Sequence, residues 1–173
     1  MPWAETATYG YSGSLLGPVV RLRSGQSVTA RISNKLPVVS SVHWHGLFVP
    51  SDVDGPFNPI SASDTWSPTL KINQPAATTW FHPHPHGDTA RQTYMGLAGL
   101  LYVDDGSAEA FNLPRDYGID DLPVILQDRN FGKDAQLIYD RSPMAMMMDR
   151  GAQMSWSMGQ FAQSRAHPPV LFG

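Results

Sequence analysis

The chain has 173 residues, of which 42% are hydrophobic and 16% charged, and its formal net charge at pH 7 is -3. This balance is typical of a globular protein with a buried core, and it lacks the basic surface of a nucleic-acid-binding domain. No stretch is apolar and long enough to span a membrane, so we expect neither nucleic acid nor a membrane as a partner.

Short segments with strand character follow one another along the chain. The clearest is 26–34, in which Val28, Ala30 and Ile32 alternate with polar residues. The other candidate strands are 19–23, 41–47, 65–72, 77–82, 99–103 and 124–127. Turn-rich connections separate these segments, and the 15 glycines and 15 prolines disfavour a helical bundle. The pattern predicts an all-β sandwich of the Greek-key type.

Two His-x-His pairs contain four of the six histidines. His43 and His45 flank Trp44, and His82 and His84 follow in a second segment. Residues two apart in a strand point to the same face, so each pair directs both imidazoles to one side. If the two strands are neighbours, the four imidazoles converge. Because neutral imidazole binds copper, zinc, iron and nickel, the sequence predicts a metal site.

The residue pattern by itself leaves the kind of site open. A single pair is compatible with a zinc hydrolase, a carbonic-anhydrase-like strand, a cupin site or solvent-facing histidines. Two pairs, each followed closely by glycine and each near a tryptophan, are far more specific for a shared metal centre. The chain has no cysteine, so no thiolate takes part in binding.

The sequence around both pairs resembles a known family. His-Trp-His-Gly-Leu at 43–47 and Trp-Phe-His-Pro-His-Pro-His-Gly at 80–87 resemble the first two copper motifs of the multicopper oxidases. The similarity extends over 73–78 and 89–100, is strongest to the bacterial cuprous-oxidase, copper-resistance and laccase-like branch, and covers roughly residues 10 to 139. It implies a cupredoxin-like sandwich and half of a trinuclear copper site.

The resemblance also implies individual roles. His43 would bind the type 2 copper, while His45, His82 and His84 would bind the paired type 3 coppers. By register, Asp54 matches an acidic residue of the family that relays protons to bound oxygen. The alternative for this residue is a turn aspartate before glycine, and one side chain can serve both roles.

Three neighbouring residues receive other roles. His86 follows the second pair, but the family uses no ligand at that position, so we expect it near the site or facing solvent. Trp44 and Phe81 alternate with the histidines, so both are expected in the core.

The function that the resemblance implies is oxidation of a small reducing substrate, phenolic or cuprous ion, coupled to reduction of dioxygen to water. This chain would supply half of the copper cluster. It has no cysteine for a type 1 copper site, so we expect further cupredoxin domains or other chains to complete the enzyme. A periplasmic or secreted location is implied by the family alone, because no signal peptide is visible at the start.

Changes in composition and patterning along the sequence predict four parts. Residues 1–105 form the cupredoxin-like domain, 106–121 a linker, 122–150 the start of a second cupredoxin-like domain, and 151–173 an irregular tail. A one-base shift of frame permits family-like residues in the tail, so one hypothesis is a frameshifted or truncated product. Met146, Met147 and Met148 allow another, a copper(I) or silver site, although methionines that only fill hydrophobic space are commoner.

Two other functions compete with the oxidase. One is a copper-binding module, or a truncated product, that holds metal without turnover. The other is a mononuclear zinc hydrolase that uses three of the four paired histidines.

Overall fold

The computed structural model describes residues 4–139. The described residues fall into two units, one of residues 6–125 and one of residues 4–5 with 126–139. The predictions for the methionine run and for the tail lie outside the described residues. Within these, no helix is long and apolar enough to cross a lipid bilayer.

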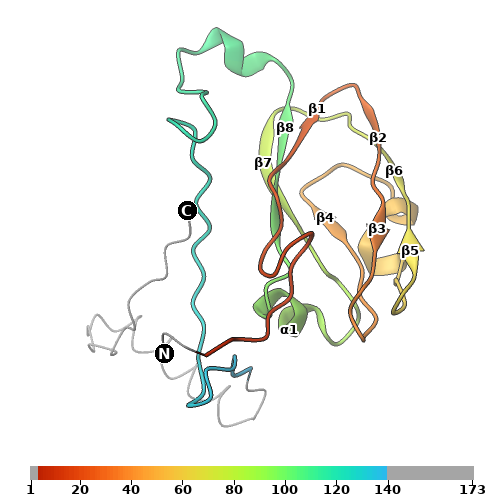
Figure 1. Cartoon of the computed structure of the whole chain (residues 1–173). Helices are drawn as coiled ribbons and strands as arrows, with labels where there is room; N and C mark the ends of the chain where they lie inside the picture. The colour runs from red at the N-terminus through yellow and green to blue at the C-terminus, as the bar shows by residue number, and fades with distance from the viewer. Residues whose placement is uncertain (1–3, 140–173) are drawn as a thin grey trace, which may run out of the picture. The chain divides into compact units, whose positions relative to one another are not determined.

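The larger unit contains a four-stranded sheet in the order β1-β8-β7-β4 (Figure 1). Its strands are β1 (Val20–Arg23), β8 (Gly99–Asp104), β7 (Ala77–His82) and β4 (His43–His45). β1 pairs parallel with β8, and the other two pairings are antiparallel. β7 therefore lies inside the sheet and β4 at its edge, so both His-x-His segments lie side by side.

Four shorter strands form two antiparallel ribbons. β2 (Ser27–Thr29) pairs with β6 (Thr69–Lys71), and β3 (Ile32–Ser33) pairs with β5 (Thr65–Trp66). The predicted strands 26–34 and 65–72 are thus each interrupted once. Proline has no amide N–H to donate to a ladder, and Pro68 stands at the break in the second segment, where its carbonyl accepts from the Ala30 N–H at 3.0 Å.

Apolar residues from both layers meet in one core. The buried cluster comprises Leu22, Val42, Trp44, Leu47, Leu70, Ile72, Phe81, Leu101 and Val103. Trp44 and Phe81 belong to it, as predicted, and their ring centroids lie 6.3 Å apart. The all-β sandwich is confirmed, and its core faces the side of β4 and β7 opposite to the paired histidines.

One α-helix in the described part of the chain escaped prediction, α1 (Thr89–Tyr94). The sequence holds its signals, because Asp88 stands at the N-cap and Gly96, with φ +123°, follows the end. Gln92 on α1 is fully buried. Its amide donates to the Val39 carbonyl at 2.8 Å and to Asp88 at 3.0 Å, and its oxygen accepts from the Ser40 hydroxyl at 2.8 Å.

The chain beyond β8 contains no strand of three or more residues within the described part. The segment 105–125 includes the 3-10 helix η3 (Ser107–Ala110) and a turn that holds Asp121 against Arg21 of β1 at 2.7 Å. The guanidinium of Arg21 also lies 5.0 Å from the ring centroid of Tyr102 and 4.8 Å from that of Tyr117. These contacts tie the segment to the sheet.

The prediction of a strand at 124–127 was wrong. The residues are apolar enough, but a strand needs a partner backbone, and the structure gives this segment none among the described residues. Val124 is accordingly 66% exposed and Leu126 81% exposed. In the smaller unit, Phe131 and Leu137 form an isolated antiparallel bridge. The assignment of 122–150 to a second domain stays a prediction.

The buried amide of Gln92 generates a stability prediction. Gln92→Ala leaves the Val39 carbonyl and the Ser40 hydroxyl without this partner and opens a void, so we expect a loss of roughly 2–4 kcal/mol in the free energy of unfolding. Urea denaturation measures it. Ala90→Gln, at an exposed position of the same helix, should change stability by less than about 0.5 kcal/mol. Equal effects of the two substitutions would contradict a stabilising role for the buried hydrogen bonds of Gln92.

Candidate metal centre

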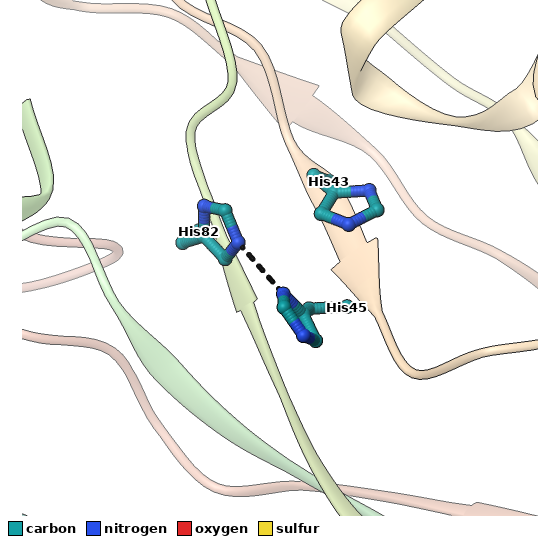
Figure 2. A group of neighbouring side chains, drawn as sticks. All are labelled: His43, His45 and His82. Atoms are coloured by element: carbon teal, nitrogen blue, oxygen red, sulfur yellow. Dashed lines mark hydrogen bonds between the residues drawn. The ribbon is translucent and has the colours of Figure 1, made fainter. Parts of the chain in front are cut away.

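The register between β4 and β7 assembles the site. His43 lies opposite His82, Trp44 opposite Phe81, and His45 opposite Trp80. Because side chains alternate along a strand, His43, His45 and His82 share one face and the two core aromatics share the other. Figure 2 shows the three imidazoles converging from the two neighbouring strands.

The three imidazoles are close enough to share metal ions. One nitrogen from each of His43, His45 and His82 lies within 4.8 Å of those of the other two. The ring centroids are 5.2 to 5.4 Å apart. His45 Nδ1 and His82 Nε2 are separated by 3.2 Å, the dashed contact of Figure 2. Three of the four predicted ligands are therefore brought together.

The fourth predicted ligand, His84, lies at the edge of this group. β7 ends at His82, and the following prolines prevent a regular continuation of the ladder. The His84 backbone N–H donates to the Ser41 hydroxyl at 2.9 Å. Its ring centroid is 5.4 Å from that of His43 and 6.1 Å from that of His82, and the side chain is exposed.

His86 is also exposed and does not belong to the three-histidine group. With His84 and Asp88 it lines part of an open groove of about 480 Å³. Gly55 also lines the groove. Neither the placement of His86 nor the groove adds a further residue to the cluster.

Hydrogen bonds fix which nitrogen of each imidazole is free. The Pro83 carbonyl lies 2.8 Å from His82 Nδ1. A carbonyl only accepts, so Nδ1 carries the proton and Nε2 keeps its lone pair. His45 Nδ1 must then donate to His82 Nε2. His45 Nδ1 could bind a metal ion only if its proton moved to Nε2 of the same ring.

Electrostatics keep His82 neutral. Its burial lowers the pKa of the imidazole to about 4, and the positive charge that His43, His45 and His84 would carry if protonated acts in the same direction. The hydrogen bond with Pro83 opposes this shift without cancelling it. At neutral pH the ring is therefore deprotonated, as a metal ligand must be.

Asp54 orients the first histidine. Its two carboxylate oxygens lie 2.9 and 2.8 Å from His43 Nδ1, so this nitrogen donates and Nε2 is left for a metal. The same carboxylate accepts from the backbone N–H of Trp44 at 3.1 Å and of Gly55 at 2.8 Å. It thereby ties β4 to the 3-10 helices η1 (Ser51–Val53) and η2 (Gly55–Phe57). The proton-relay role stays a prediction.

Three residues that support the site escaped prediction. Gln74 accepts from the Phe48 N–H at 2.8 Å and donates to the Gly46 carbonyl at 3.1 Å, which holds the turn after β4. Ser41 anchors His84, as described above. Trp80 lies two residues before His82 in β7, so the period of two in a strand would have placed it on the metal-facing side.

Comparison with known proteins identifies the family. The sequence model of the family described as multicopper oxidase matches residues 2–108. The chain belongs to the multicopper oxidase family. The resemblance predicted from the two histidine motifs is thereby confirmed, and copper is the metal of this family.

Relatives and solved structures agree. The multicopper oxidase mco of Staphylococcus haemolyticus is 44% identical over 125 residues, covering 72% of this chain and 28% of the relative. The cell division protein FtsP of Escherichia coli is 39% identical over 135 residues, covering 76% and 29%. A bacterial laccase-like multi-copper oxidase, CueO from an Ochrobactrum species, has a TM-score of 0.78 at 47% identity, covering 84% of this chain and 33% of that one.

These matches confirm the all-β, cupredoxin-like fold of the multicopper oxidases. This chain spans less than a third of the length of the curated relatives named here. The imidazole cluster fits the family's metal, because copper binds neutral nitrogen donors well. Within the described residues, His43, His45 and His82 form a group that could hold it.

The pKa of His82 generates a prediction for the metal-free protein. Between pH 6.5 and about 4 the unfolded chain binds a proton at this histidine and the folded protein does not. Lowering the pH through this window therefore favours unfolding, by up to about 3 kcal/mol. Denaturant titrations at pH 7 and pH 4 should show the loss, and His82→Gln should reduce it. An identical pH dependence in the two proteins would contradict the burial effect.

Gly55 generates a second prediction. A Cβ at this position would lie 2.3 Å from the Val42 carbonyl carbon and 2.6 Å from the His43 nitrogen. Gly55→Ala must push η2 away from β4, so we expect a loss of about 1–3 kcal/mol in the free energy of unfolding. Gly13→Ala is the control, since a Cβ there meets nothing within 4 Å. Thermal unfolding compares the two, and a stable Gly55→Ala protein would contradict the close packing.

Proposed function

We propose that the protein binds copper on the β4–β7 face as one half of a trinuclear site, in an oxidase that couples oxidation of a small reducing substrate to reduction of dioxygen. The observation that supports this most is the convergence of three imidazoles, from His43, His45 and His82, with one nitrogen of each within 4.8 Å of those of the others. His84, at the edge of the group, is proposed as the fourth ligand of this half-site.

Copper held here would supply one-electron redox chemistry toward dioxygen. The chain's own residues prepare the ligands for it. Asp54 holds His43 with Nε2 free, the Pro83 carbonyl holds His82 in the same tautomer, and burial keeps His82 unprotonated. His45 and His84 are exposed, so the cluster opens to one side of the sheet.

We propose two linked roles for Asp54. Its hydrogen bonds to His43 and to the β4 backbone make it a positioning residue. As a partly buried carboxylate beside a ligand, it would also accept and return protons that the reduction of dioxygen consumes. Its side chain is 17% exposed, which leaves a route for protons from solvent.

The proposed enzyme needs more than these residues. Four histidines leave a trinuclear cluster half-filled, and the chain has no cysteine for a type 1 site. We infer that further cupredoxin domains or other chains supply the remaining ligands and the substrate site. The substrate is then a phenol or Cu(I), as in the branch that the motifs resemble, and the location periplasmic or secreted. The division into 1–105, 106–121, 122–150 and 151–173 belongs to the same proposal.

A second candidate function is a copper-binding or structural module without turnover. The observation that favours it is the similarity to the FtsP proteins, which are named for cell division and not for oxidation. Their identities, 41% and 39%, are close to the 44% of the relative named as an oxidase. Membership of the family therefore does not distinguish the two functions.

Copper titration tests the binding site. The protein should bind Cu(II) with an EPR spectrum of nitrogen ligation, and His82→Gln should weaken binding at least about tenfold. His86→Gln is the matched control, because His86 is an exposed histidine outside the group, and it should bind as the wild type does. Equal losses in both variants, or no copper binding by the wild type, would contradict the proposed site.

Oxygen uptake separates the two functions. With copper and a phenolic or cuprous substrate, we expect little turnover by the chain alone and oxidase activity once the remaining domains are supplied. Copper binding without uptake in that complete assembly would favour the module. Exclusive zinc binding with hydrolytic activity would favour the zinc hydrolase instead.

A further inference from the structure

Trp80 shares the metal-facing side of the β4–β7 pair with the histidines. It lies directly opposite His45 in the register, while Trp44 and Phe81 point to the core. Its side chain is only partly buried. Hydrophobic packing against the core therefore does not account for its position.

Those neighbours are two of the proposed ligands. The Trp80 ring centroid lies 4.0 Å from that of His82, with 30° between the ring planes. It lies 5.1 Å from that of His45, with an interplanar angle of 34°. Both ring pairs are tilted, and aromatic contacts at these distances favour some ring orientations over others.

The three imidazoles differ in what orients them. His43 is held by the Asp54 carboxylate and His82 by the Pro83 carbonyl. A metal-binding histidine usually has such a partner on its second nitrogen. His45 has none in the described part of the chain, where its one hydrogen bond goes to His82, through a nitrogen that metal binding would claim. Its remaining ring contact on the β7 side is Trp80.

We propose that Trp80 is a positioning residue that orients His45 through ring contact, in place of the hydrogen bond that the other two imidazoles have. If a metal ion took the place of the proton between His45 and His82, that hydrogen bond would be lost, whereas the ring contact with Trp80 would remain. The inference rests on the proposed copper function. It assigns Trp80 to the metal site, whereas the neighbouring Phe81 belongs to the core.

Copper titration followed by EPR tests this role with three variants. Trp80→Leu removes the ring, and we expect about tenfold weaker Cu(II) binding and altered copper hyperfine splitting. Trp80→Phe restores a stacking ring and should recover most of the affinity. Trp66→Leu is the matched control, since Trp66 packs partly buried against the core and makes no ring contact with the histidines among the described residues. It should lose stability and keep the copper affinity.

NMR relaxation of the His45 ring carbons in the metal-free protein gives a second measurement. The wild type and Trp80→Phe should show a rigid ring and Trp80→Leu a more mobile one, while the hydrogen bond to His82 keeps the proton on Nδ1 in all three. An equally rigid His45 ring in Trp80→Leu, or equal copper affinity in Trp80→Leu and wild type, would overturn the inference and leave the proposed site intact. Failure of the wild type to bind copper would instead overturn the proposed function, and the role of Trp80 with it.

Discussion

The pairing of β4 with β7 is the constraint on which the site depends. With His43 opposite His82, the ligands gather on one face and Trp44 and Phe81 fill the core on the other. A slip of one residue would send the histidines of one strand into the core and its aromatic residue to the surface. The two buried aromatics therefore specify the register that assembles the metal centre, and hydrophobic packing and metal binding select the same alignment.

The loops around this pair turn a row of imidazoles into oriented ligands. The Asp54 carboxylate accepts hydrogen bonds from both the His43 ring and the backbone of β4. Gly55 permits the close approach to β4 that brings the Asp54 carboxylate to these donors. On the other side, Gln92 joins α1 to the segment before β4, and Ser41 holds the backbone of His84. The contacts of Gln92 and Ser41 each join a segment near one histidine motif to a segment near the other. Their shared effect is to order ligands before metal arrives, which lowers the entropy lost on binding.

Much of this arrangement could be predicted from the sequence. Period-two alternation and turn residues predicted the sandwich, and the His-x-His spacing predicted which side chains share a face. The ends of the strands were harder to predict. The break in pairing at Pro68 can be placed only once the partner strand is known. The isolated apolar stretch at 124–127 has the composition of a strand, but strand formation depends on a neighbour that local sequence does not reveal. The hydrogen bonds of Asp54, Gln74 and Gln92 depend on contacts between distant segments, so only the structure shows them.

Imidazoles of β4 and β7 are proposed to bind copper together. Pulsed EPR of the Cu(II)-loaded protein, prepared with natural and ¹⁵N-labelled histidine, tests it most directly. We expect modulation from histidine nitrogens that changes with the label and is lost or reduced in His43→Gln and His82→Gln, each from a different strand. Copper signals that carry no histidine nitrogen coupling, or that are unchanged when either strand loses its ligand, would contradict it.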